Sequence, residues 1–122
     1  MTSTAPLSVR RLIQNLAFEF ADRLAKRELL ERTTRLETTV FTQDDTPFSR
    51  ACNTIDWPQI FGDVIQHEVS WRVDDDAVES LNLAAFDGEG RLLLTRFYRL
   101  TWDGRLALHD EIFNPRAPFR NP

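Results

Sequence analysis

The chain has one cysteine, one lysine, one tyrosine and four glycines, and of these the single cysteine limits the possible covalent cross-links. Cys52 has no partner in the chain, so no intrachain disulfide can form, and a reducing compartment fits this composition. No apolar run approaches the about 20 residues of a membrane-spanning helix, and the N-terminal residues lack the apolar core of a signal peptide. We therefore expect a cytoplasmic protein without a membrane partner.

Motifs that hold metals, nucleotides or catalytic nucleophiles are also missing. His67, His109 and Cys52 do not have the spacing of metal ligands, and the Asp74–Asp76 triplet lacks the spacing and terminal glutamate of a calcium loop. The sequence contains no phosphate loop, dinucleotide fingerprint or nucleophile elbow. The net charge of −4 is not gathered in blocks and argues against a general nucleic-acid binder. We expect no cofactor, no metal and no nucleic-acid partner.

The first half of the chain has the periodicity of helices. With 122 residues, 42% of them hydrophobic, it is long enough for a single domain, residues 1–122, with its own core. From about Leu7, apolar residues recur at three- and four-residue spacings, which predicts an amphipathic helix with Ser8 as its N-cap. Its apolar stripe comprises Val9, Leu12, Ile13, Leu16, Ala17, Phe20 and Leu24.

Further elements are predicted before the middle of the chain. A short helix is expected over 27–31, and the threonine-rich stretch 33–42 is typical of a strand. Asp56 as N-cap and Pro58 in the first turn indicate a helix over 57–66, whose apolar residues, Val64 among them, should enter the core.

The stretch from Val78 to Asn114 has the clearest strand pattern. Three runs rich in strand-forming residues are separated by two turns that contain glycine, Asp87–Gly90 and Trp102–Gly104. Another strand is expected over 67–73, and the proline-rich tail 115–122 is expected to be irregular. Helices followed by a run of strands predict an α+β fold in which the helices cover a curved antiparallel sheet.

The segment 97–115, FYRLTWDGRLALHDEIFNP, resembles the closing hairpin of the nuclear transport factor 2-like superfamily. That superfamily includes SnoaL-like polyketide cyclases and steroid delta-isomerases. The shared pattern is an apolar strand, a tight turn at Asp103-Gly104 and a strand that ends before Pro115. The resemblance implies a cystatin-like cone, an α+β barrel in which a bent sheet wraps around helices and leaves a pocket. It covers most of the chain by architecture and about the last forty residues by motif, and it points to a fold, not a reaction. Steroid isomerases carry a pocket acid where this chain has Arg96.

Alternation along the three strands divides their residues into two faces. The resemblance puts one set in the pocket, namely Ser80, Asn82, Ala84, Phe86, Leu92, Leu94, Arg96, Tyr98, Ala107, His109, Glu111 and Phe113. Burial alone favours the other, more apolar set, which includes Leu81, Leu83, Phe97, Leu106, Leu108 and Ile112. If the first set faces the pocket, the second forms an apolar outer face that a homodimer would cover. If the second set faces the helices, the polar residues are surface residues. A hairpin loop over 101–104 pairs Arg96 with His109, whereas a shift by one residue pairs Arg96 with Asp110.

In the pocket arrangement, His109 is the candidate general base, because histidine can accept a proton near neutral pH. Arg96 and Tyr98 would donate hydrogen bonds to a carbonyl or enolate oxygen. The remaining candidate ligand-binding residues are Asn82, Phe86, Glu111 and Phe113. Each candidate also has a structural explanation: a strand histidine, an ion pair between Arg96 and a neighbouring carboxylate, and core packing of Tyr98.

The expected function is the binding of a small apolar molecule in a SnoaL-like domain. Its catalytic form would be acid–base chemistry of the isomerase, cyclase or dehydratase type on an apolar carbonyl compound. The alternative is a non-catalytic ligand carrier, or an assembly module like the small subunit of ring-hydroxylating dioxygenases.

Overall fold

The structure is a computed structural model that describes residues 5–43, 45–62, 64–73 and 79–114. The predicted turn at Asp74–Asp76 and the tail 115–122 lie outside these residues. The elements are α1 (Ala5–Lys26), the 3-10 helix η1 (Leu30–Arg32), β1 (Arg35–Thr42), α2 (Pro47–Cys52), α3 (Trp57–Phe61), β2 (Gln66–Val73), β3 (Ser80–Phe86), β4 (Leu92–Leu100) and β5 (Leu106–Phe113).

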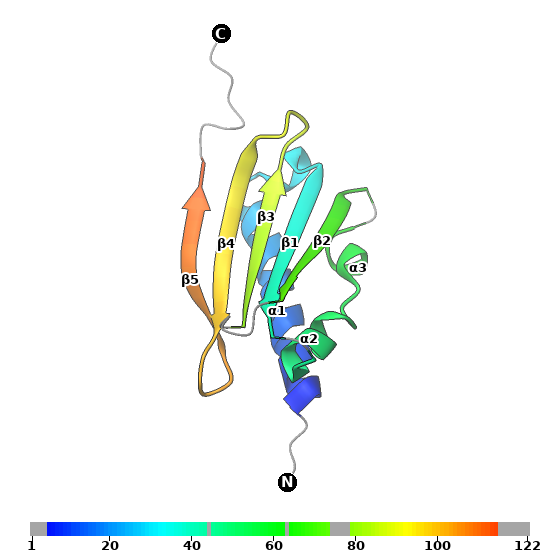
Figure 1. Cartoon of the computed structure of the whole chain (residues 1–122). Coiled ribbons are helices and arrows are strands. Elements are labelled where there is room, and N and C mark those ends of the chain that lie inside the picture. The colour runs from blue at the N-terminus through cyan, green and yellow to red at the C-terminus, as the bar shows by residue number, and fades with distance from the viewer. Residues whose placement is uncertain (1–4, 44, 63, 74–78, 115–122) are drawn as a thin grey trace.

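The strands form one five-stranded sheet in the order β2-β1-β3-β4-β5 (Figure 1). The predicted α+β class is confirmed, and the sheet is mixed and not closed. The expectation of a wholly antiparallel sheet is wrong, because β1 and β2 are parallel. Parallel neighbours need a crossover connection, and the segment that contains α2 and α3 supplies it.

Helix α1 carries the predicted apolar stripe and ends without a glycine. Leu29 N–H donates to the Leu24 carbonyl at 2.8 Å and Glu28 N–H donates to the Ala25 carbonyl at 3.0 Å, which is the Schellman pattern. Glu28 occupies the left-handed position with φ of 58°, where glycine is the usual residue. Leu24 and Leu29 are both buried in the core, as the apolar residues that accompany this motif commonly are.

Two short helices differ from the sequence-based prediction. Helix α2 was not predicted, because Thr46-Pro47 has the composition of a loop. Its start is a capping box in which Ser49 N–H donates to the Thr46 hydroxyl and Thr46 N–H donates to the Ser49 hydroxyl. Helix α3 begins at Asp56 as predicted but ends at Gly62, where φ is 100°. Val64 therefore lies beyond the helix and is 95% exposed, so its predicted place in the core is wrong.

The core lies between α1 and one face of the sheet, here called the inner face. Helix α1 runs behind the sheet in Figure 1, and α2 and α3 pack against α1. Residues paired across antiparallel strands share a face, which places Leu36, Val40, Leu81, Leu83, Ala85 and Leu94 together on the inner face. Phe20 of α1 contacts Phe61 of α3 edge-on, with ring centroids 6.2 Å apart. The stripe residues Ile13, Leu16, Ala17, Phe20 and Leu24 are all buried, which confirms that part of the prediction.

The opposite face, here called the outer face, is less apolar than the homodimer prediction requires. Leu81 and Leu83 were assigned to it, but both pair with inner-face residues and are fully buried. Their places are taken by Asn82 and Ala84, which pair with Phe97 and Thr95. The premise of a broad apolar outer face is therefore wrong, and a homodimer through that face stays a prediction.

Candidate functional site

Arg96 in the middle of β4 joins three elements on the inner face. Its side chain is 5% exposed. The Nε group donates to Glu111 Oε2 of β5 at 2.9 Å, and Nη1 donates to the Tyr98 hydroxyl at 2.9 Å. Nη1 also lies 3.4 Å from Glu19 Oε1 of α1. One guanidinium thus ties helix α1 to the β4–β5 hairpin.

A second guanidinium supports the same carboxylate. Arg27 Nη2 lies 3.8 Å from Glu111 Oε1, and the Arg27 guanidinium carbon lies 4.2 Å above the Phe113 ring. Glu111 therefore contacts two cations, and its side chain is 25% exposed. This arrangement holds the carboxylate oxygen against Arg96.

The electrostatics keep the Tyr98 hydroxyl protonated. Burial raises the pKa of the phenol, Arg96 opposes that shift, and the net pKa lies above its ordinary value. Burial alone would lower the pKa of Arg96, but its hydrogen bonds to Tyr98 and Glu111 reverse this, so the pKa is raised. Both groups therefore act as hydrogen-bond donors at neutral pH. The Tyr98 oxygen accepts from Arg96, and no described residue accepts the Tyr98 proton.

A groove opens beside Tyr98, between α1 and the hairpin. It has a volume of about 300 Å³. Its lining residues are Leu12, Asn15, Leu16, Glu19, Tyr98 and Leu106. Three leucines form apolar walls, and the polar groups of Asn15, Glu19 and Tyr98 lie along the same groove. Most ligand sites have this composition, with apolar walls and a few placed polar groups.

His109 lies away from this groove. It is the extra residue of a bulge between the pairs Phe97–Asp110 and Tyr98–Leu108. The imidazole is exposed on the outer face and packs edge-on against Phe97, with ring centroids 5.7 Å apart. His109 and Arg96 therefore do not share an enclosed cavity, and the structure gives His109 no contact with the groove.

Both predicted registers of the hairpin are wrong. The turn spans five residues, because Thr101 N–H donates to the Arg105 carbonyl at 2.7 Å and Leu100 pairs with Leu106. The bulge at His109 then adds one more residue to β5. Arg96 consequently pairs with Glu111, two residues beyond His109.

The other predicted ligand-binding residues are divided between two places. Glu111 belongs to the Arg96 cluster, and Phe113 lies beneath Arg27 at its edge. Asn82 is on the outer face, where its side-chain oxygen accepts from the Thr95 hydroxyl at 3.1 Å. Phe86 lies 4.6 Å beneath the Arg35 guanidinium and does not line the groove.

Two groove residues were missed from the sequence. Asn15 and Glu19 belong to α1 and lie outside its predicted apolar stripe. Both lie three residues after an apolar stripe residue, Leu12 or Leu16, so they border the stripe. That spacing is the one signal that could have indicated them.

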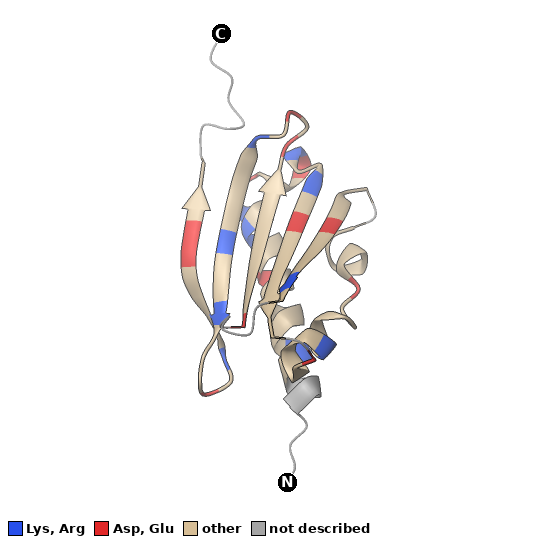
Figure 2. Cartoon of the chain, viewed as in Figure 1, with Lys and Arg blue, Asp and Glu red and all other residues tan. Residues whose placement is uncertain are grey.

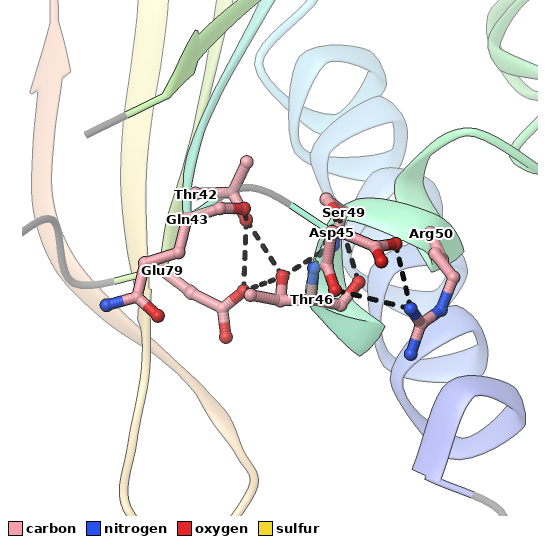
Figure 3. A network of polar contacts seen from close by, with 7 residues as sticks. All are labelled: Thr42, Gln43, Asp45, Thr46, Ser49, Arg50 and Glu79. Atoms are coloured by element: carbon pink, nitrogen blue, oxygen red, sulfur yellow. Dashed lines mark hydrogen bonds and ion pairs between the residues drawn. The ribbon is translucent and has the colours of Figure 1, made fainter. Parts of the chain in front are cut away.

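A larger cavity, of about 470 Å³, also lies on the inner face but toward the β2 edge of the sheet, between β1, β2 and α2. Its lining residues are Thr42, Gln43, Asp45, Ser49, Arg50, Asn53, Trp71 and Val73. Figure 3 shows that polar groups here point toward one another. Arg50 Nη1 donates to Asp45 Oδ1 at 2.9 Å, and the hydroxyl of Thr42 lies 3.0 Å from Glu79 Oε2.

These contacts serve the fold. Glu79 precedes β3 and accepts from the Thr46 hydroxyl at 2.5 Å, so it joins the start of β3 to the cap of α2 (Figure 3). Burial, followed by the nearby Glu79 charge, raises the pKa of the Cys52 thiol to about 12, so the thiol is protonated at neutral pH. Several polar side chains of the larger cavity are bonded to one another, whereas the Tyr98 proton in the smaller groove has no acceptor among the described residues. We therefore favour the groove beside Tyr98 as the candidate site.

Comparisons with known proteins identify no relative, since no protein-family model and no curated protein matches the chain. Within the described ranges, no three His, Cys, Asp or Glu side chains are grouped so that they could hold a metal ion. None of the described helices is both long enough and apolar enough to cross a membrane. Acidic and basic residues are interspersed over helices and strands (Figure 2).

Proposed function

We propose that this chain binds a small, mainly apolar molecule with a carbonyl oxygen in the groove between α1 and the β4–β5 hairpin. The observation that carries the proposal is the hydrogen bond from Arg96 Nη1 to the Tyr98 hydroxyl, 2.9 Å long. Because the phenol oxygen accepts from Arg96, its proton is directed to another acceptor, and a charged donor strengthens it as a donor. The leucine walls suit the apolar part of the ligand.

This proposal agrees with the resemblance to the nuclear transport factor 2-like superfamily. The resemblance implies a pocket between the helices and a bent sheet, and we propose the groove between α1 and the β4–β5 hairpin as that pocket. The SnoaL-like assignment and the cone itself are part of the proposal.

The catalytic form of the proposal is proton transfer next to a carbonyl, as in an isomerase, cyclase or dehydratase. Glu19 takes the role of base that the sequence suggested for His109, because its carboxylate lines the groove and is 54% exposed. Tyr98, supported by Arg96, donates to the oxygen on which negative charge develops. His109 has no role in this chemistry.

Binding can be tested with matched pairs of ligands, such as a polycyclic ketone and its parent hydrocarbon, followed by amide NMR shifts. We expect both to shift groove residues such as Leu16 and Leu106. Tyr98→Phe should weaken ketone binding about tenfold, the value of one hydrogen bond of about 1–1.5 kcal/mol, and leave hydrocarbon binding unchanged. His109→Ala is the matched control and should bind both as the wild type does.

Two results would contradict the proposal. One is a set of shifts around Trp71 with none at the groove, which would move the site to the larger cavity. The other is equal ketone affinity for the wild type and Tyr98→Phe. For the catalytic form, Glu19→Gln should lower turnover of a bound ketone while its affinity is retained, and unchanged turnover would exclude Glu19 as the base.

A further inference from the structure

Strand β2 is an open edge of the sheet. It pairs with β1 along eight consecutive residue pairs without a bulge, and no described strand lies on its other side. Seven of its eight residues are exposed. Three of these, Val69, Trp71 and Val73, are large and apolar and recur at every second residue on the inner face. A regular edge strand with exposed apolar residues is a template for pairing with another strand.

The other edge of the sheet is protected. Strand β5 carries the bulge at His109, which interrupts its hydrogen-bonding edge, and the charged residue Asp110 follows directly. Bulges and charges at an edge are the usual means by which proteins prevent strand addition. Strand β2 also carries two charged residues, Glu68 and Arg72, but it has neither a bulge nor a proline. The two edges therefore differ, and β2 is the one suited to a partner.

The direction of the backbone groups of β2 follows from one hydrogen bond. Gln66 N–H donates to the Thr34 carbonyl at 2.9 Å, so the Gln66 backbone groups point toward β1. Backbone groups alternate in direction along a strand. The N–H and C=O groups of His67, Val69, Trp71 and Val73 consequently point away from β1, toward the open edge.

We propose that β2 pairs antiparallel with β2 of a second copy of this chain, with Ser70 on the two-fold axis. This register places Val69 opposite Trp71 of the second copy and His67 opposite Val73 of the second copy. Both are pairs whose backbone groups face the partner, so about eight backbone hydrogen bonds form. The apolar side chains of the two edges then cover one another on the inner face.

Charge selects this register over its neighbours. On the outer face, Glu68 pairs with Glu37 across β1 and β2, and the two acidic positions lie side by side in Figure 2. Arg35 alone serves both, at 3.2 Å from Glu37 and 3.7 Å from Glu68. Arg72, on the same face, makes no ion pair with a described residue. Pairing about Ser70 places Glu68 of each copy opposite Arg72 of the other. The interface therefore gains two cross-strand pairs of opposite charge.

The adjacent registers allowed by the backbone lack this match. A two-fold axis at Glu68 places that residue opposite its own copy, with two like charges in contact. An axis at Val69 places Glu68 opposite Ser70, and an axis at Trp71 places Arg72 opposite Ser70. Opposite charges directly across a strand pair stabilise it and like charges destabilise it, so Ser70 is the favoured centre.

Sedimentation equilibrium of the full chain over a concentration series tests the proposal. The wild type should fit a monomer–dimer equilibrium. Glu68→Arg and Arg72→Glu each create two like-charge pairs by symmetry and should raise the dissociation constant about tenfold or more. The double variant Glu68→Arg/Arg72→Glu restores opposite charges and should return the dissociation constant to within about threefold of the wild type. Glu31→Arg, an exposed charge reversal in η1, is the matched control and should leave it unchanged.

Three results would overturn the proposal, provided that circular dichroism shows the variants folded. The first is a wild type that stays monomeric throughout the series. The second is a dimer that the two single reversals do not weaken. The third is a double variant that dissociates as readily as the single ones, which would exclude the Ser70 register.

Discussion

The cluster around Arg96 predicts a specific loss of stability when its cation is removed. Arg96→Met keeps most of the apolar length of the side chain and deletes the guanidinium. The hydrogen bond to Glu111 is charge-assisted and contributes about 1.5–3 kcal/mol, and the one to Tyr98 contributes about 1 kcal/mol. Glu19 is 54% exposed, so its contact with Arg96 adds little. Glu111 is partly exposed and regains some hydration, which reduces the loss.

Taken together, Arg96→Met should lower the free energy of unfolding by about 2–3 kcal/mol. Much of that loss comes from a partly buried carboxylate left with fewer partners. The double variant Arg96→Met/Glu111→Met removes that carboxylate as well, so its loss should be smaller than the sum of the two single losses.

Urea unfolding followed by tryptophan fluorescence measures these values, at a protein concentration where the chain is monomeric. Arg105→Met is the control, because that side chain is 80% exposed in the hairpin turn, and it should not change the midpoint. If Arg96→Met unfolds at the same urea midpoint as the wild type, the predicted loss of stability is wrong. Strictly additive losses in the double variant would refute the role given to the carboxylate.

Two further predictions concern buried titratable groups. Burial would raise the pKa of Asp87, but N–H groups of Arg91 and Glu89 and the Arg91 guanidinium lower it below its ordinary value. Its stabilisation is therefore present above the unfolded pKa of about 3.9 and lost as pH falls through the lower folded pKa. Asp87→Asn should flatten the acid limb of stability against pH, and an unchanged limb in urea unfolding would contradict this. Cys52, with a pKa of about 12, should react with a thiol reagent at pH 8 only as fast as the chain unfolds, and labelling at the rate of a free cysteine would contradict its burial.

The sequence predicted best those elements in which apolar residues recur at the regular period of a helix or a strand. The stripe of α1 follows the helical period, and the strands of the last third alternate, so both were predicted close to their bounds. Helix α2 was missed because its cap uses Ser49 in place of the more usual glutamate, and Thr46-Pro47 is typical of loops. The end of α3 at Gly62 depends on one residue with positive φ inside an otherwise apolar run.

The site was predicted in part. Arg96, Tyr98 and Glu111 lie together, as their shared strand parity indicated. His109 was misplaced because the five-residue turn shifts the first half of β5 by one residue, which reverses the face of its side chains. The bulge adds a second shift, which returns Glu111 to the face of Arg96. No residue type near His109 signals a bulge. Glu19 and Asn15 reach the groove through the docking of α1 on the sheet, which sequence spacing alone does not define.

The bulge also changes how β5 should be compared with other chains. Residues 106–108 and 110–113 follow the same alternation of faces, but with opposite phase, because His109 stands between them as an added residue. A relative without that residue would match the two halves only if a gap is opened at His109. An ungapped match would equate interior positions of one chain with solvent positions of the other over half the strand, and Glu111 would lose its correspondence to the residue that holds Arg96.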